Sequence, residues 1–149
     1  MPVVTADLFI ADAGLQRVWD VVADFESYPA LMPNVLSIDI VERRGNTAVS
    51  AWRTLLDGTE MSWEERDLFE PYRRISFEQL DGDLEVFRGE WTLDEEDGGV
   101  RIRLSVEFEI GIPSLAAVLD PLGVQAIRAN SLSMLNAIGE RLSTLEPAA

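Results

Sequence analysis

The stretch LDGDLEVFRGEWTL, residues 80–93, carries the clearest signal of the fold. Its Asp81-Gly82 pair is typical of a tight hairpin turn. After this pair, apolar and polar residues alternate, as in a strand with one face toward the interior. Gly89, between Phe87 and Trp91, predicts an opening on that face, because a strand glycine often marks a bulge, a bend or close approach by another body. We expect that other body to be a ligand.

The periodicity on both sides of this stretch predicts strands, then helices, then strands again, with a long helix at the end. Apolar and polar residues alternate most regularly from Val100 to Ile110, so we expect one face of the sheet to be exposed to solvent. Pro121 and Gly123 predict a kink or short break near Asp120 in the last helix. The expected strands are Val3–Ala11, Val35–Glu42, Thr47–Leu56, Glu60–Phe69, Arg74–Leu80, the opening stretch and Val100–Ile110; the expected helices are Ala13–Ala23 with Asp12 as N-cap, Pro29–Met32 and Ser114–Leu145.

The length and charge of the chain limit its partners. A chain of 149 residues fits one domain, expected to cover residues 1–149. The formal net charge of −15 repels nucleic-acid phosphates and anionic lipid headgroups, so neither is an expected partner. No basic leader or membrane-length apolar run is visible, so we expect a cytoplasmic protein with no membrane insertion.

Three residue types are missing from the sequence. It contains no Cys, no His and no Lys, and all 12 basic residues are Arg. This excludes a Cys nucleophile, a Lys Schiff base, a Ser–His pair and the usual imidazole or thiolate metal sites. Acid–base chemistry is left to Asp, Glu, Tyr and water, assisted by Arg. No loop has calcium-type spacing, so we expect neither a metal nor a cofactor.

These elements predict an α+β architecture. The apolar face of a single antiparallel sheet must be covered, and only the long C-terminal helix is large enough to cover it. A seven-stranded sheet curved around a helix leaves space between the two. We therefore expect an internal cavity with aromatic and aliphatic walls.

Four features together resemble one known superfamily. They are the element order, the segment FESYPALMP at 25–33, the pattern DG-x-x-x-x-F-x-G-x-W-x-L at 81–93 and the FEI at 108–110. They resemble the START-like helix-grip superfamily, which is also called the birch-pollen-allergen-like superfamily. Within it, the chain is similar to the polyketide cyclase/dehydratase family, which includes coenzyme-Q-binding proteins and ribosome-association toxins. The resemblance runs from about Val3 to Leu142, and it implies the cavity more firmly than any reaction.

Alternation along residues 60–69 turns Glu65 and Asp67 toward the cavity, together with Trp63. A buried carboxyl group with a raised pKa suits a general acid or base. The alternatives are a strand end open to solvent or a bulge that reverses the faces. The resemblance implies a catalytic arginine on this strand at Arg66, but alternation gives Arg66 the opposite face. Arg53 and Arg88 are the substitutes, each equally compatible with a surface ion pair.

Aromatic residues complete the candidate site. The resemblance implies an aromatic residue over the cavity entrance at Tyr28, whose phenol could donate a hydrogen bond to a ligand carbonyl, although simple packing explains it equally well. Arg88 and Gly89 would also face the ligand. The expected walls of the cavity are Trp52, Trp63, Phe77, Phe87 and Trp91.

The leading functional hypothesis is an enzyme of the cyclase/dehydratase (aromatase/cyclase) type. It would fold a hydrophobic polyketide-like or aromatic intermediate, with an acyl carrier protein as a partner if the substrate is tethered. The alternative is a non-catalytic carrier of a quinone-like or lipidic molecule. A protein-interaction module is a third option, which the net charge weakens. The orientation of the ionisable groups toward or away from the cavity distinguishes the first two.

Overall fold

A computed structural model describes residues 1–144 of the chain. Seven strands form one sheet in the order β1-β7-β6-β5-β4-β3-β2, and every neighbouring pair is antiparallel. The strands are β1 (Val3–Ala11), β2 (Val35–Arg44), β3 (Thr47–Leu56), β4 (Thr59–Glu70), β5 (Arg74–Gly82), β6 (Val86–Glu96) and β7 (Gly99–Glu109). The helices are α1 (Leu15–Val22), η1 (Phe25–Ser27), α2 (Tyr28–Leu31), η2 (Pro113–Leu115) and α3 (Ala116–Thr144).

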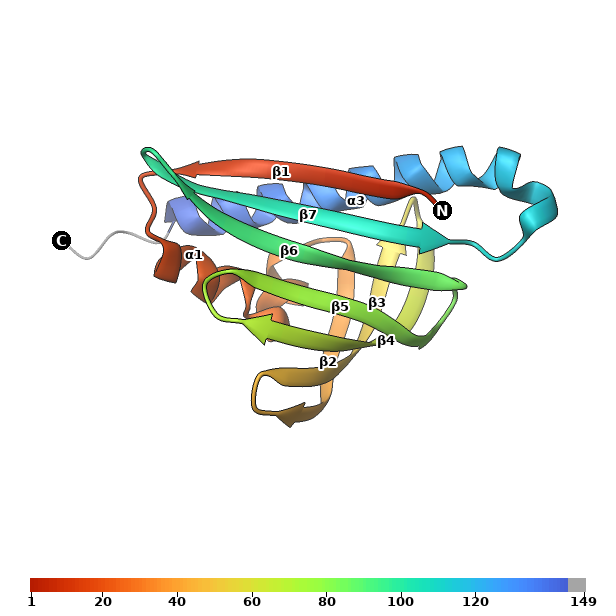
Figure 1. Ribbon diagram of the computed structural model, residues 1–149, viewed down its shortest axis with the longest axis horizontal. Coiled ribbons are helices and arrows are strands. Elements are labelled where there is room, and N and C mark those ends of the chain that lie inside the picture. The colour runs from red at the N-terminus through yellow and green to blue at the C-terminus, as the bar shows by residue number, and fades with distance from the viewer. Residues whose placement is uncertain (145–149) are drawn as a thin grey trace.

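The sheet curves around helix α3, as the sequence predicts. In Figure 1 strands β1 and β7 cross in front of α3, β6 and β5 continue the sheet below the helix, and β4, β3 and β2 turn away behind them. Buried Ile127, Leu135 and Ile138 of α3 join the buried face of β7 in one hydrophobic core. Burial of this apolar stripe is the main force that holds a helix on a sheet. The predicted helix-grip fold class is confirmed.

Helix α3 continues through Pro121, so of the two predicted alternatives near Asp120, a kink or a short break, the break is wrong. Pro121 lies near the beginning of the helix, where a missing N–H removes only one backbone hydrogen bond. The first turns of α3 extend past the sheet in Figure 1, and Val118 and Leu122 are exposed there. The predicted end at Leu145 lies outside the described residues.

The start of α1 also differs from the prediction. Asp12 is not an N-cap: it has a positive φ of 59°, and its N–H donates to Gly98 O at 2.7 Å. It therefore belongs to the turn that leaves β1. Gly14 occupies the N-cap position without a side-chain hydrogen bond, and α1 begins at Leu15.

The Asp81-Gly82 pair belongs to strand β5 and not to the predicted turn, which follows it. Gly82 lies opposite Trp63 of β4, and a Cβ atom at residue 82 would come within 2.5 Å of Trp63 Cβ. Glycine is needed here so that the Trp63 side chain can lie against the neighbouring strand. Asp83 then starts the turn, and its carboxylate accepts a hydrogen bond from Ser62 N at 2.8 Å.

The predicted opening above Gly89 is wrong as well. Gly89 lies opposite Phe77 of β5, and a Cβ atom there would come within 2.9 Å of Phe77 Cζ and 2.0 Å of Ser105 O. The glycine therefore serves close approach within the sheet and not access for a ligand. The strand face next to it is filled by the Phe77 ring.

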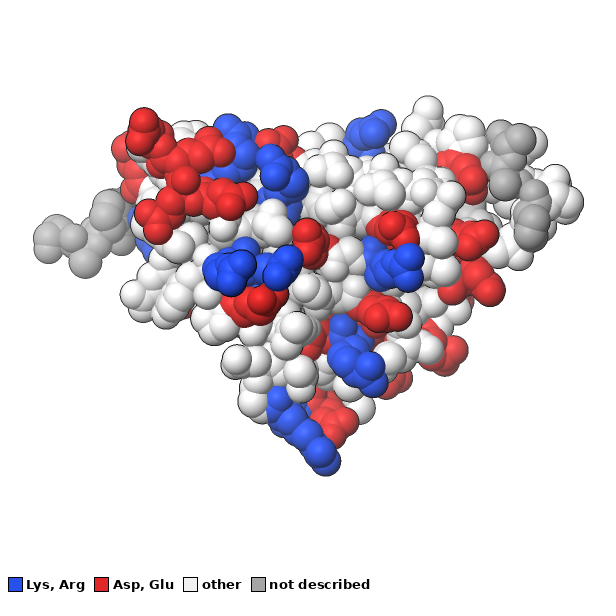
Figure 2. Space-filling model, viewed as in Figure 1, with Lys and Arg blue, Asp and Glu red and all other residues white. Residues whose placement is uncertain are grey.

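The outer face of the sheet carries interspersed charges of both signs, as Figure 2 shows. Arg74 pairs with Glu70 and Glu90, and Arg101 pairs with Asp7 and Glu96. Such exposed pairs each contribute little to stability. Within residues 1–144, no helix is long and apolar enough to cross a membrane.

The close approach at Gly89 predicts that Gly89→Ala lowers the free energy of unfolding by about 1 to 3 kcal/mol, because the carbonyl of Ser105 cannot move without disturbing β7. Urea unfolding at constant pH measures the loss. Gly14→Ala is the matched control, since no atom lies within 4 Å of its added methyl group. Equal stabilities of the two variants would contradict the assignment.

Candidate functional site

A small cavity lies between the inner face of the sheet and the middle of α3. Its volume is about 40 Å³, whereas pockets that hold drug-sized ligands measure about 300 to 1,000 Å³. A cavity of this volume has room for a few water molecules. Its lining residues are Trp52, Thr54, Leu56, Trp63, Glu65, Phe77, Phe87, Trp91, Leu104, Val106, Ile127, Asn130, Ser131 and Met134.

Aromatic rings fill most of the space between the walls. The rings of Trp52 and Trp63 are stacked, with centroids 5.6 Å apart and planes at 13°. Phe87 lies 5.0 Å from Trp63 and 5.6 Å from Phe77. All five aromatic residues predicted as walls line the cavity. Trp63, Phe87 and Leu56 are only half-buried, so the cavity comes closest to solvent on their side.

Two buried carboxyl groups lie side by side at this aromatic enclosure, and of the two only Glu65 is among the residues that line the cavity. Glu65 and Asp67 are two residues apart on β4 and point to the same face, with exposed fractions of 2% and 0%. Trp63 Nε1 donates to Glu65 Oε1 at 2.6 Å, and Ser50 Oγ donates to Asp67 Oδ2 at 2.6 Å. Trp52 Nε1 in turn donates to Ser50 Oγ at 2.8 Å. Both carboxyl groups are thus held in place by neutral donors.

One proton shared between the carboxyl groups explains this arrangement. Oδ1 of Asp67 is buried, and no N–H or hydroxyl group of the described residues donates to it. The side chains of Glu65 and Asp67 are close enough for each to shift the pKa of the other. A proton on Glu65 supplies the donor that Asp67 lacks, and it removes one of two charges that would otherwise repel each other.

The pKa values of the two groups follow the same pattern. Burial raises the pKa of Glu65 well above its ordinary range, and the hydrogen bond to charged Asp67 raises it further. Burial also raises the pKa of Asp67, but hydrogen bonds from Glu65 and Ser50 and the charge of Arg43 oppose this rise. Glu65 is therefore the acid of the pair and Asp67 the carboxylate.

Sequence reasoning missed the polar atoms on the other walls. Thr54 Oγ1 on β3 and Asn130 Oδ1 on α3 are buried without a hydrogen-bond partner among the described residues, and both residues line the cavity. Ser131 is buried beside Asn130. Ser50 and Thr54 on the buried face of β3, and an Asn-Ser pair within the apolar stripe of α3, were the available signals. Such atoms are suited to a ligand's polar group.

The three predicted arginines do not reach the cavity, which corrects their expected role. Arg53 is exposed and pairs with Glu60 at 2.9 Å, and Arg88 pairs with Glu107 on the outer face. Arg66 is exposed on the face of β4 opposite Glu65, as alternation along the strand requires. The family pattern that placed a catalytic arginine at Arg66 therefore does not apply to this chain.

Tyr28 is also corrected: it lies in the core and not over an entrance. It is fully buried, its hydroxyl donates to Val22 O of α1, and its ring packs against Phe25, Trp52 and Trp91. Burial raises the pKa of its phenol well above the ordinary value. A phenol that is already hydrogen-bonded and difficult to ionise has a structural role.

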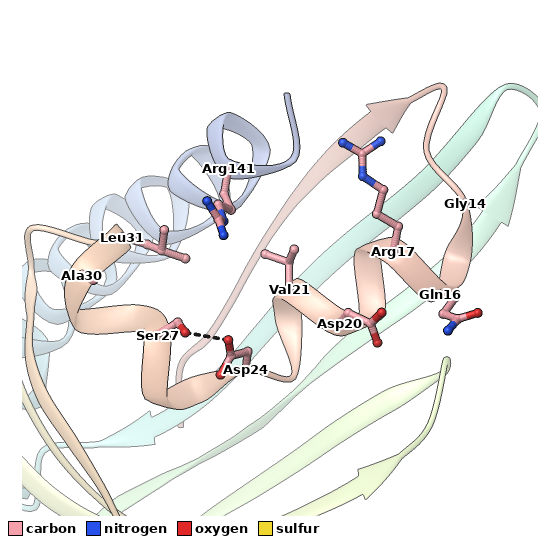
Figure 3. Close-up of a pocket in the computed structure, with 10 residues that line it drawn as sticks. All are labelled: Gly14, Gln16, Arg17, Asp20, Val21, Asp24, Ser27, Ala30, Leu31 and Arg141. Atoms are coloured by element: carbon pink, nitrogen blue, oxygen red, sulfur yellow. Dashed lines mark hydrogen bonds between the residues drawn. The ribbon is translucent and has the colours of Figure 1, made fainter. Parts of the chain in front are cut away.

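A larger hollow lies on the surface, on the far side of α1. Figure 3 shows this open groove of about 740 Å³ between α1, α2 and the last turns of α3. Ser27 Oγ donates to Asp24 at 2.6 Å, and Arg17 donates to Leu142 O at 2.6 Å, which ties α1 to the end of α3. The groove holds none of the buried unpartnered polar atoms found above. We therefore assign the chemistry to the inner cavity.

The fold and the enclosed acidic site define a helix-grip protein with a small internal cavity. Residues 12–135 match the family model described as polyketide cyclase / dehydrase and lipid transport. The chain therefore belongs to this family. No curated protein matches the sequence.

Solved structures with the same fold include enzymes and lipid-transfer proteins. The protein TTHA0849 of Thermus thermophilus is 26% identical, with a TM-score of 0.89 over 98% of this chain and 100% of that one. The Zhui aromatase/cyclase of a Streptomyces species is 21% identical, with a TM-score of 0.81 over 95% of this chain and 93% of that one. A STAR-related lipid transfer protein of Xanthomonas axonopodis is 15% identical, with a TM-score of 0.73 over 94% and 85% of the two chains.

The raised pKa of Glu65 predicts that the native protein loses stability as the pH rises. The unfolded chain releases this proton near the ordinary carboxyl pKa and the folded chain at a higher pH, so the free energy of unfolding falls between these two values. In Glu65→Gln, a neutral amide replaces the acid and this dependence disappears. The free energy of unfolding of Glu65→Gln, minus that of the native protein, should therefore rise by up to about 1.4 kcal/mol per pH unit above pH 5.

Urea unfolding of the native protein and Glu65→Gln from pH 5 to pH 8 provides the measurement. Glu64→Gln removes a carboxyl group from the preceding residue, on the opposite face of β4, and should follow the native curve. Parallel curves for native protein and Glu65→Gln would rule out the shared proton.

The buried phenol predicts a second effect on stability. Tyr28→Phe leaves Val22 O without this donor, so the free energy of unfolding should fall by about 1 kcal/mol. Because Tyr28 does not line the cavity, ligand affinity should stay unchanged. Urea unfolding and a ligand titration on one sample test both statements, and an affinity loss above tenfold would restore Tyr28 to the site.

Proposed function

We propose that the protein is a cyclase/dehydratase-type enzyme that acts on a hydrophobic polyketide-like or aromatic intermediate in this cavity. The supporting observation is the buried pair Glu65 and Asp67, an acid in the wall of the cavity and a carboxylate next to it. Acid–base catalysis requires one group that is protonated and one that is ionised at the same pH, which means two groups with different pKa values. Family membership and the aromatase/cyclase fold neighbours agree with this reaction class.

The two groups act together in an aldol closure and dehydration, and because Glu65 lines the cavity while Asp67 does not, the substrate exchanges protons with Glu65. Glu65 passes its proton to Asp67 and takes a proton from a carbon beside a carbonyl group, and the resulting enolate carbon attacks a second carbonyl carbon. Glu65 then protonates the oxygen of that second carbonyl, which becomes a hydroxyl group. In the dehydration, the Glu65 carboxylate takes a proton from the adjacent carbon and gives it to this hydroxyl, which leaves as water, and the proton held by Asp67 returns to Glu65. No oxidant or cofactor enters this balance.

The remaining polar atoms would hold the chain in position. Thr54 Oγ1 can donate to a ligand carbonyl, and the Asn130 side-chain amide offers a further partner on α3. The Trp52 ring, on which Trp63 stacks, offers a flat surface suited to a conjugated chain. An acyl carrier protein belongs to this proposal as the donor of a tethered substrate.

The proposal predicts a loss of turnover in Glu65→Gln. With a synthetic poly-β-ketone thioester as substrate, kcat should fall by roughly 10²- to 10⁴-fold, since the amide keeps the shape but cannot transfer the proton. Ultraviolet absorbance follows the aromatic product, and mass spectrometry follows the loss of water. Arg66→Gln, a change on the outer face of the same strand, should keep native turnover. Native turnover in Glu65→Gln would overturn the catalytic assignment.

A carrier of a hydrophobic molecule is the second candidate. It is favoured by the cavity lining, which contains no arginine among the described residues, and by the lipid-transport branch of the family. A carrier would bind its ligand unchanged. Native mass spectrometry of protein from its own host identifies this case if the bound molecule is a quinone or lipid retained equally by Glu65→Gln.

A further inference from the structure

Trp63 has the geometry of a bound ligand inside the cavity of its own protein. Its indole stacks on Trp52 with centroids 5.6 Å apart, and its edge contacts Phe87. Its only polar atom, Nε1, donates to Glu65 Oε1 at 2.6 Å. Stacking on one ring, a second ring at the side and one hydrogen bond to a buried acid are the contacts expected for an aromatic ligand.

The position of Trp63 also allows it to leave. It is half-buried at the side of the cavity nearest to solvent, whereas its stacking partner Trp52 is buried. Gly82, opposite it on β5, presents no side chain on that side of Trp63. A rotamer change at Trp63 would vacate the volume of an indole without moving the strand. That volume would add to the present cavity of about 40 Å³.

We propose that the Trp63 indole occupies the place of the ligand's ring in the empty protein, and that the ligand is a flat, neutral aromatic molecule with an O–H or N–H donor directed at Glu65. This inference rests on the proposed function, because it names the chemical class that the same cavity binds. A phenol formed by cyclisation and dehydration belongs to this class.

The electrostatics of the cavity support a neutral ligand. Asp67 holds a negative charge beside Glu65, and no basic residue is among the lining residues described. An anionic ligand would meet this charge at low dielectric without a compensating cation. The O–H of a phenol or the N–H of an indole, in contrast, replaces the lost hydrogen bond of Trp63 one for one.

The experiment truncates Trp63 and replaces its ring from solution. In Trp63→Ala, indole should bind and raise the unfolding midpoint. 1-Methylindole has nearly the same shape but no N–H, and it should bind about tenfold more weakly, which corresponds to about 1.4 kcal/mol. Isothermal titration calorimetry measures both affinities. In Trp63→Ala/Glu65→Leu this preference should vanish, because the acceptor is gone.

A measurement on the native chain covers the case in which Trp63→Ala does not fold. 2-Naphthol should displace the Trp63 ring and shift its Nε1–H nuclear magnetic resonance signal, which Trp63→Phe assigns. 2-Methoxynaphthalene, without the donor, should do so about tenfold more weakly. Trp19→Phe, which alters a tryptophan outside the cavity lining and keeps an aromatic ring in the core, should leave both responses unchanged.

Two results would overturn the inference. Equal binding of indole and 1-methylindole, or an unmoved Trp63 signal at saturating 2-naphthol, would show that Trp63 does not hold the ligand's place; the proposed function would survive either result. Failure of every aromatic probe to bind both proteins would instead overturn the inference and the proposed function together.

Discussion

The site depends on the burial of two carboxyl groups side by side in one enclosure. Two charges on Glu65 and Asp67 would repel each other and lose their hydration, with no buried cation to offset the cost among the described residues. A proton shared between them would remove one charge and give Asp67 Oδ1 the donor that it lacks. The Ser50 hydroxyl then stabilises the remaining charge. The acid and the base are therefore consequences of one buried arrangement, which also holds both groups ready for proton transfer.

The neighbouring aromatic residues keep this arrangement in place. Trp63 and Trp52 each use the ring N–H in the hydrogen-bond network and the ring face in stacking. The same rings that direct the donors limit the cavity to about 40 Å³, so little water fits beside them. Hydrogen bonds in such a low-dielectric setting are strong, and losing one partner is costly. The walls of the cavity and its polar chemistry are thus built from the same side chains.

Periodicity along the chain predicted the fold and the inward face of β4, because both follow from apolar burial at regular spacing. Periodicity also correctly placed Arg66 on the outer face of β4, where the family resemblance implied an inward arginine. The failures at Gly82 and Gly89 have one physical cause. The function of a strand glycine depends on the cross-strand neighbour, Trp63 in one case and Phe77 in the other, and that register cannot be read from local sequence. The prediction for Tyr28 was wrong for a similar reason, since the acceptor of its hydroxyl, Val22 O, lies on a separate helix.

The small cavity is consistent with binding if closing and opening are two states of one enclosure. In the closed state, Trp63 stacks on the Trp52 ring and donates a hydrogen bond to Glu65 Oε1. These two contacts replace those of a ligand, so the cavity stays stable when no ligand is bound. A ligand must then surpass these internal contacts, and its apparent affinity is reduced by the fraction of molecules that are open. A hydrophobic molecule that offers only apolar area would leave Glu65 without its donor. A ligand with its own O–H or N–H donor restores the hydrogen bond to Glu65. The contacts of the closed state therefore favour ligands that carry such a donor.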